Sequence, residues 1–216
     1  MDKQFYLERL KSLGIVAVVR AESREQASSI AKAVIDGGIK IIEITYTVPG
    51  ATEAIKALAD EYRDTDVIVG AGTVLDAETA EEAIDAGAMF VVSPCLVEEV
   101  VEVCKKHNVI SMPGAMTVRE AFMGIKSGGD IVKIFPGELF GPAIIKAFKG
   151  PLPFAQMMPT GGVSADNIAD WIKAGAVAVG VGGSLTASAS KGDYDTITKK
   201  ASELVQKLAL ARGEKV

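Results

Sequence analysis

A glutamate and a lysine interrupt two of the most apolar stretches of this chain. Glu43 lies within the run Ile39–Thr45, and Lys133 lies within Ile131–Pro136. A charge inside an apolar strand is costly unless it is paired or does chemistry. Loss of contact with water lowers the pKa of an amine, so that a buried lysine can attack a carbonyl carbon as a neutral nucleophile. A nearby carboxylate could then act as the general base.

The alternative for these two residues is a buried salt bridge that only closes the fold. We favour the catalytic interpretation, because hydrophobic side chains usually serve stability as well as a buried ion pair or better. The sequence does not fix the distance between Glu43 and Lys133.

Two glycine-rich segments form a second signal. They are Met158–Ser164 and Gly180–Ser184, and each follows an apolar run. Glycine lets the backbone approach an anion closely, and backbone N–H groups at such loops often bind phosphate. Each segment could also be a tight turn in which Ser164 merely caps the following helix. Two such loops on neighbouring strands favour phosphate binding.

The elements that would position these residues recur along the chain as short Val- and Ile-rich runs. Helical patterns rich in Ala, Glu, Leu and Ile separate the runs, as expected for βα units. The eight runs expected to be strands are Ile15–Arg20, Ile39–Thr45, Val67–Thr73, Met89–Pro94, Val109–Gly114, Ile131–Pro136, Phe154–Thr160 and Val177–Val181.

Eight units predict an α/β protein, namely a compact (β/α)8 TIM barrel that forms one domain over residues 1–216. Asp2–Ser12 would be an extra N-terminal helix, and Asp193–Ala211 would be the last helix. A doubly wound parallel sheet is the alternative, but it normally has fewer strands at this length, and no GxGxxG follows the first run.

Active sites of such barrels lie at the carboxyl ends of the strands. Side chains alternate between the two faces of a strand, which groups the residues at each strand end. The groups that share a face are Ile41, Glu43 and Thr45; Ile131, Lys133 and Phe135; Val16, Val18 and Arg20; and Val69, Ala71 and Thr73.

Composition excludes several classes of protein. Net charge is −5 and the pI is about 5.1, which argues against nucleic acid or an anionic membrane as partner. The amino terminus is not a signal peptide, and no apolar run reaches the length of a membrane span. Two cysteines and one histidine leave little material for a metal site, and we expect neither metal nor cofactor. The cysteine pattern indicates the cytoplasm.

Together the motifs resemble the 2-keto-3-deoxy-6-phosphogluconate (KDPG) and 2-keto-4-hydroxyglutarate (KHG) aldolases. The resemblance covers nearly the whole chain and is specific because many motifs occur together. The matching segments are Gly14–Arg20, Ile42–Thr45, Val69–Leu75, Val92–Pro94, Met112–Gly114, Val132–Pro136, Pro159–Gly162 and Val181–Ser184.

This resemblance implies a class I aldolase, usually a homotrimer, that acts on a small 2-keto acid. Lys133 falls on the family's Schiff-base lysine and Glu43 on its acid/base glutamate. Such an enzyme would cleave KDPG to pyruvate and glyceraldehyde 3-phosphate, and also KHG to pyruvate and glyoxylate. Alternatives are an aldolase specific for 2-keto-3-deoxy-6-phosphogalactonate (KDPGal), a phosphosugar epimerase-like barrel, and a non-aldolase barrel that binds a phosphate ligand.

Further positions are expected to contact the substrate. Thr73 falls at the pyruvate end, and the glycine loops fall at the phosphate end. Many family members carry an arginine where this chain has Thr47, so Arg20 is the candidate to hold an anion instead. The full set of expected substrate-binding residues is Arg20, Thr47, Thr73, Pro94, Phe135, Thr160, Gly161, Gly162, Gly182, Gly183 and Ser184.

Overall fold

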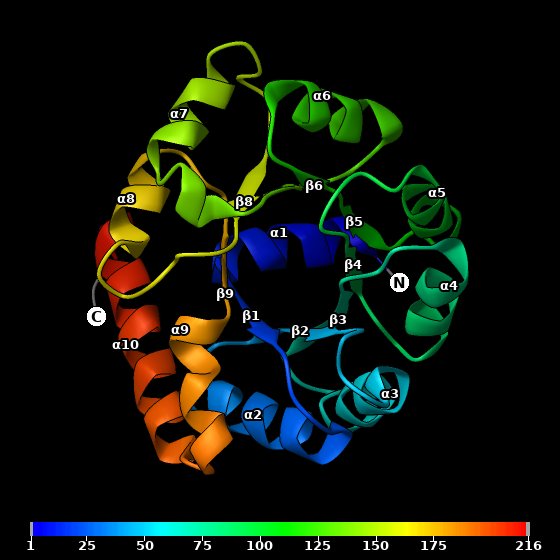
Figure 1. Ribbon diagram of the computed structural model, residues 1–216, viewed down its shortest axis with the longest axis vertical. Helices are drawn as coiled ribbons and strands as arrows, with labels where there is room; N and C mark the ends of the chain where they lie inside the picture. The colour runs from blue at the N-terminus through cyan, green and yellow to red at the C-terminus, as the bar shows by residue number, and fades with distance from the viewer. Residues whose placement is uncertain (1, 215–216) are drawn as a thin grey trace.

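A computed structural model describes residues 2–214 of the chain as a ring of parallel strands surrounded by helices (Figure 1). All strand pairs in it are parallel. The strands are β1 (Ile15–Val19), β2 (Ile41–Thr45), β3 (Ile68–Gly72), β4 (Phe90–Val92), β5 (Ile110–Met112), β6 (Gly114–Ala115), β7 (Val132–Ile134), β8 (Met157–Pro159) and β9 (Val179–Val181).

Backbone hydrogen bonds arrange the strands in two sheets. The order is β5-β4-β3-β2-β1-β9 in the larger sheet and β6-β7-β8 in the smaller one. The sheets join at two places, since β6 follows β5 directly after Pro113 and a parallel bridge links Thr160 to Gly180. A 3.0 Å hydrogen bond from the amide of Val177 to the carbonyl of Met157 supports the second junction. The curled sheet is therefore TIM-barrel-like, as the sequence predicted.

Helices follow the strands and pack on the outside of the ring, except the first helix, which precedes β1 and closes one end of the barrel. They are α1 (Lys3–Leu13), α2 (Arg24–Asp36), α3 (Ala51–Glu61), α4 (Ala77–Asp85), α5 (Glu98–His107), α6 (Val118–Ser127), α7 (Ala143–Lys149), α8 (Ile168–Lys173), α9 (Gly183–Thr186) and α10 (Tyr194–Arg212), with 3-10 turns η1 (Gly137–Leu139) and η2 (Ala187–Lys191). Polar residues cap several of them: Thr117 and Glu120, for example, form a reciprocal capping box at the start of α6.

The strands differ from the sequence prediction in two details. The run Val109–Gly114 was expected to be one strand, but Pro113 divides it into β5 and β6, because proline has no N–H to donate to the ladder. The strands are also shorter than the apolar runs; the run from Phe154, for example, enters the sheet only at Met157. The short helix α9 and the turn η2 precede the expected last helix.

Two hydrophobic clusters separate the inside of the ring from its outside. Val16, Ile41 and Ile131 belong to the inner cluster, which also contains residues of α1. Their neighbours along the strands belong to the outer cluster, which packs against the helices. By alternation, Glu43 follows Ile41 to the inside and Lys133 follows Ile131. Polar side chains thus enter the barrel near the carboxyl ends of β2 and β7.

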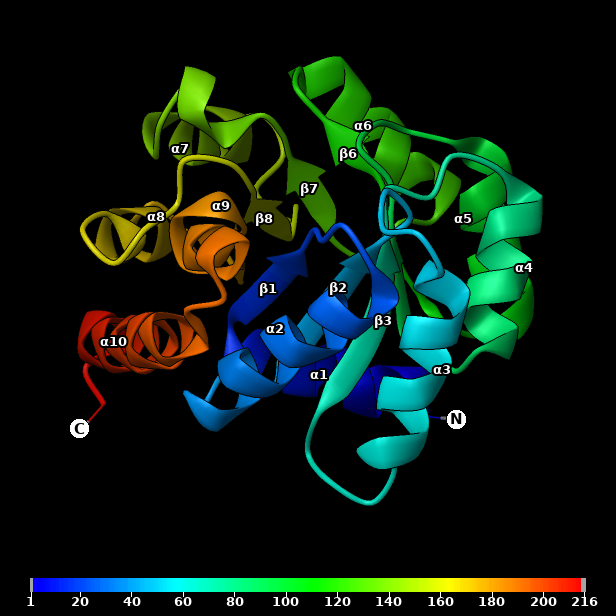
Figure 2. The same cartoon turned by 60° about the horizontal axis from the view of Figure 1, so that its bottom comes forward.

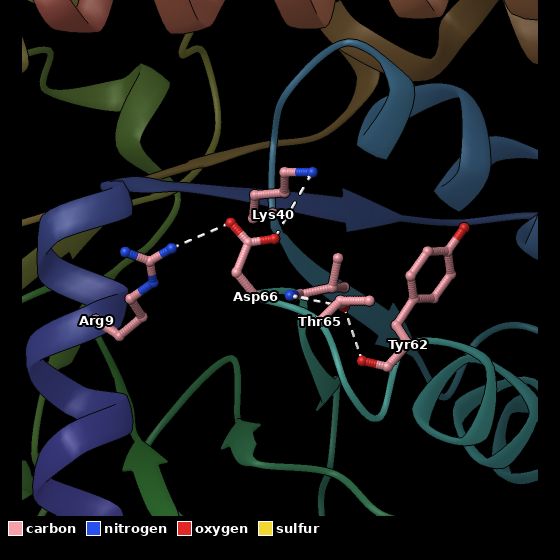
Figure 3. Close-up of polar contacts among 6 residues, drawn as sticks. Arg9, Lys40, Tyr62, Thr65 and Asp66 are labelled. Carbon is pink, nitrogen blue, oxygen red and sulfur yellow. Dashed lines mark hydrogen bonds and ion pairs between the residues drawn. The ribbon is translucent and has the colours of Figure 1, made fainter.

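Helix α1 closes the opposite end of the barrel. It crosses the ring in Figure 1 and lies under the strands in Figure 2, and its Leu7 and Leu10 are buried in the inner cluster. Figure 3 shows Asp66 between Arg9 of α1 and Lys40. The distance from Arg9 Nη2 to Asp66 Oδ2 is 3.1 Å, and that from Lys40 Nζ to Asp66 Oδ1 is 3.8 Å.

No helix within residues 2–214 is both long enough and apolar enough to cross a membrane.

Candidate active site

Glu43 and Lys133 face each other across the inside of the barrel. Lys133 Nζ lies 3.8 Å from Glu43 Oε1, and the two residues are 3% and 0% exposed. Glu43 sits at the centre of β2, and Lys133 sits at the centre of β7 between Gly114 of β6 and Met158 of β8. The fold therefore joins the two charged residues that stand about 90 positions apart in the sequence.

Two glycines leave space for polar side chains inside the barrel. A Cβ on Gly72 would lie 2.0 Å from Glu43 Oε1, and a Cβ on Gly180 would lie 2.2 Å from Thr160 Oγ1. Neither glycine has a positive φ, so here space rather than backbone conformation requires glycine. Gly72 thus leaves the volume that the carboxyl group of Glu43 occupies.

The carboxyl group of Glu43 is buried without a hydrogen bond. Neither of its oxygens has a hydrogen-bond partner among the described residues, and 3.8 Å is too long for a hydrogen bond to Lys133. Burial raises the pKa of Glu43 above its ordinary value of 4.5, against the opposing effect of the positive charges of Lys133 and Arg20. A pair that served only to close the barrel would be expected to make direct hydrogen bonds.

Phe135 forms a wall beside the amine. Its ring centroid lies 5.1 Å from Lys133 Nζ, within the range in which an aromatic face attracts a cation. The side chain is half-buried and also borders the cavity above.

A cavity of about 390 Å³ opens over the carboxyl ends of β1, β7, β8 and β9. Eight of the expected substrate-binding residues line this cavity, although some of them lie more than 160 positions apart in the sequence. These eight are Arg20, Phe135, Thr160, Gly161, Gly162, Gly182, Gly183 and Ser184.

The two glycine loops are held together by side chains. Ser184 Oγ donates a 2.7 Å hydrogen bond to the carbonyl of Val163, and Lys200 Nζ donates a 2.8 Å hydrogen bond to the carbonyl of Ser184. Gly161 and Gly162 have φ values of 95° and 70°, which only glycine adopts readily. The loops are therefore positioned before any ligand arrives.

Two residues of the cavity present polar groups that make no hydrogen bond within the described part of the chain. Arg20 directly follows β1 and makes no hydrogen bond or ion pair with another residue in the range 2–214. The hydroxyl of Thr160 is buried without a hydrogen-bond partner among those same residues. Both groups are free to bind a ligand.

Three expected substrate-binding residues lie outside this cavity. Thr47 is exposed, and its hydroxyl lies 2.7 Å from that of Thr45. Pro94 is half-buried after β4, on the other side of the ring. Thr73 was grouped with Ala71, but Ala71 packs outward against the helices, and Thr73 has a φ of 58°. Side chains alternate between the two faces only along extended backbone, so alternation does not predict the direction of the Thr73 side chain.

Four residues that line the cavity are not among the expected substrate-binding residues. They are Val18, Glu138, Val163 and Ser164. Glu138 could have been found, because it is a charged residue just beyond the strand that carries Lys133, where polar side chains reach the mouth of a barrel. Within residues 2–214, no group of three or more His, Cys, Asp or Glu side chains is arranged to hold a metal ion.

Comparison with known proteins identifies the family of this chain. The sequence profile "KDPG and KHG aldolase" matches residues 7–200. The chain belongs to the KDPG and KHG aldolase family. A 2-dehydro-3-deoxy-phosphogluconate aldolase of Treponema pallidum is 36% identical over 203 residues, which are 92% of this chain and 95% of that protein. A KHG/KDPG aldolase of Escherichia coli K12 is also 36% identical, over 89% of this chain and 91% of that protein.

Solved structures of this aldolase family share the fold. A native KDPGal structure has a TM-score of 0.86 at 31% identity and covers 92% of this chain and 96% of its own. A KDPG aldolase from Legionella pneumophila, with pyruvate captured as a covalent carbinolamine, has a TM-score of 0.82 at 26% identity over 90% and 96%. A designed cage built from fused symmetric oligomeric domains also matches, at 0.86 and 31% over 93% and 73%. Membership of the family makes the chain a carbon–carbon lyase and supports the aldolase interpretation over the epimerase-like and non-catalytic alternatives.

Proposed function

We propose that this chain is a class I aldolase that cleaves KDPG to pyruvate and glyceraldehyde 3-phosphate and accepts KHG as a second substrate. The proposal covers residues 1–216 as one catalytic domain. The observation that carries it is the buried pair of Lys133 and Glu43, whose amine and carboxyl group lie 3.8 Å apart with no hydrogen bond between them. The family supports both the reaction class and the substrate class.

In the proposed mechanism Lys133 Nζ attacks the C2 carbonyl carbon, and loss of water gives an imine. The protonated imine draws electrons from the C3–C4 bond while Glu43 removes the proton of the C4 hydroxyl. That bond breaks and the aldehyde leaves. The remaining enamine takes up a proton at C3, and water hydrolyses the imine to release pyruvate and the free amine.

The surroundings of the pair fit these steps. Neither oxygen of Glu43 accepts a hydrogen bond from a residue in the range 2–214, so the carboxylate is available to take a hydroxyl proton. Burial raises the pKa of Glu43, which makes its carboxylate a stronger base than an exposed glutamate. The Phe135 ring near Nζ stabilises positive charge on that nitrogen, including the charge of a protonated imine.

The cavity above the pair would hold the rest of the substrate. Gly161, Gly162, Gly182, Gly183 and Ser184 would bind the phosphate through their loops. Thr160, whose buried hydroxyl is unpartnered, would lie between the loops and the reacting carbons.

The remaining assignments would complete the substrate site. Arg20 would hold an anionic group in place of the arginine that is absent at Thr47. Thr73 would contact the pyruvate end, since it follows β3, the strand next to that of Glu43, and Pro94, which follows β4, would also contact the substrate. These assignments follow the family resemblance and the strand order.

Three properties of the whole enzyme belong to this proposal. The reaction needs no metal, since the imine on Lys133 supplies the electron sink. The enzyme is a homotrimer, in line with the symmetric oligomeric domains named for the designed cage. It works in the cytoplasm, where its two free cysteines, Cys95 and Cys104, stay reduced.

Imine trapping tests the proposal. Borohydride reduction in the presence of pyruvate should inactivate the enzyme and leave a pyruvyl adduct on the peptide that contains Lys133. Lys146, on helix α7, serves as the matched control because Lys146→Ala should trap as the unchanged protein does. An adduct on another lysine, or none, would contradict the proposal. Steady-state kinetics with KDPG, KDPGal and KHG then identify the preferred substrate.

A further inference from the structure

One carboxylate lies in the cavity and takes no part in the proposed mechanism. Glu138 belongs to the turn η1 directly after β7, and it lines the cavity together with Phe135 and the glycine loop. The side chain is exposed and forms no hydrogen bond or ion pair with another residue between 2 and 214. It is an unpaired negative charge at the place where an anionic substrate has to bind.

The structure holds Glu138 at this place. The amide of Gly137 donates a 2.8 Å hydrogen bond to the carbonyl of Thr160, which ties the turn to the start of the glycine loop. A Cβ on Gly161 would lie 1.9 Å from Glu138 Oε2, and a Cβ on Gly162 would lie 2.8 Å from Glu138 Cβ. The side chain therefore packs directly on the two glycines.

The order of residues along the cavity indicates which part of the substrate meets Glu138. Phe135 borders the amine of Lys133, and the glycine loop is the proposed phosphate end. Glu138 lies on that loop and follows Phe135 by three residues. If C2 is bound to Lys133, C4 lies at Glu43 and the C6 phosphate lies on the glycine loop against which Glu138 packs, then we place C5, the carbon between C4 and C6, beside Glu138.

The proposed substrates differ at this carbon. C5 of KDPG carries a hydroxyl group, whereas C5 of KHG is itself a carboxylate. A carboxylate side chain accepts a hydrogen bond from a hydroxyl, but it repels another carboxylate. We propose that Glu138 is a specificity-determining residue that selects substrates with a C5 hydroxyl over substrates with a C5 carboxylate. This inference rests on the proposed function and adds its substrate preference.

The substitution Glu138→Gln tests the inference, because it removes the charge and keeps the shape and one acceptor oxygen. We expect kcat/KM for KHG to rise about tenfold and that for KDPG to change less than threefold. The KDPG-to-KHG ratio of kcat/KM should therefore fall about tenfold. Glu138→Ala removes the acceptor as well, so it should also lower kcat/KM for KDPG about tenfold.

The matched control is Glu102→Gln, an exposed glutamate on α5 that forms no ion pair with the described residues. It should leave the substrate ratio unchanged. Pyruvate ends at C3, so borohydride trapping with pyruvate should be the same in both Glu138 variants as in the unchanged protein. Normal trapping also shows that the variants are folded.

The outcomes separate the two proposals. A KDPG-to-KHG ratio that stays constant or rises in Glu138→Gln, with normal trapping, overturns the role of Glu138 alone. Failure of the unchanged protein to trap pyruvate overturns the proposed function, and the inference with it. If the unchanged protein does not cleave KHG, gain of that activity in Glu138→Gln supports the inference and its absence overturns it.

Discussion

Glu43 is removed from water without receiving a hydrogen bond in return, which is an expensive arrangement for a carboxyl group. Burial raises its pKa, and the charges of Lys133 and Arg20 only partly oppose this. Between the ordinary pKa and the raised one, the folded protein therefore holds a proton that the unfolded chain has released. Folding stability must fall as the pH rises through this window, because the unfolded chain is ionised there and folding has to take up a proton.

Glu43→Gln should accordingly separate activity from stability. We expect turnover to fall by roughly 10²- to 10⁴-fold, the usual contribution of a general base, while imine trapping with pyruvate survives. Above the window the variant should be more stable to denaturant than the unchanged protein, because it no longer has to bury an ionised carboxylate at position 43. Near-normal turnover would show that another group moves the proton.

The pH profile gives a second measurement on the same residue. Glu43 must be deprotonated to act as a base, so kcat/KM should fall on acidification at a pH above the ordinary glutamate pKa of 4.5. Glu102→Gln should keep this acidic limb, and Glu43→Gln should lose it. A limb that persists in Glu43→Gln would assign it to a different group.

A separate prediction concerns Arg20, which lies at the mouth of the barrel. It lines the cavity without a hydrogen-bond partner in the described part of the chain, and a guanidinium is well suited to bind a desolvated carboxylate or phosphate. Arg20→Ala should cost about 1.5–3 kcal/mol of substrate binding, seen as a higher KM. Adding Thr47→Arg should restore part of the loss. An unchanged kcat/KM in Arg20→Ala would make the arginine structural.

At the scale of elements, the loop after β9 offers a clean test of the phosphate end. Gly162 is unsuitable, since its φ is 70° and any Cβ would meet Glu138. Gly183 has no atom within 4 Å of the Cβ position and no positive φ, so it tolerates a side chain. Gly183→Asp adds a negative charge to the cavity, whereas Gly183→Asn adds a neutral side chain of the same shape.

Gly183→Asp should therefore raise the KM for KDPG about tenfold more than Gly183→Asn does. The difference between the two variants should be smaller for pyruvate, measured by imine trapping, because pyruvate does not reach the phosphate end. Equal KM values in the two variants would show that the phosphate does not bind near this loop.

The sequence predicted the strands and helices well wherever apolar periodicity was strong, and less well where single residues decide. Alternation placed Glu43 and Lys133 on the inside of their strands, which the inner cluster confirms. It failed at Thr73, because a left-handed residue ends the pattern, and at Pro113, because a missing N–H divides a strand. The place of Glu138 just beyond the strand of Lys133 is visible in the sequence, but its packing on the glycine loop depends on the conformation of one turn.

At the scale of the molecule, the two ends of the barrel differ in character. Helix α1 fills one end with Leu7 and Leu10, and Glu43, Lys133 and the cavity occupy the other. Large apolar side chains are exposed near the second end, where they follow β6 and β7. They are Met116, Val118, Phe122, Leu139 and Phe140. Such exposed apolar side chains are typical of surfaces that bind another protein chain.

The proposed trimer would bury part of this surface, and Phe122 provides the test. It is 46% exposed on α6, one helical turn after Val118, so both side chains lie on the same face. Phe122→Glu would place a charge in the interface and should reduce the solution mass from three times 22.6 kDa towards that of one chain. Phe154→Glu is the matched control, because Phe154 is 62% exposed but lies in the loop before β8 and not on α6. Light scattering should therefore find Phe154→Glu trimeric; if Phe122→Glu is also trimeric, this surface does not form the interface.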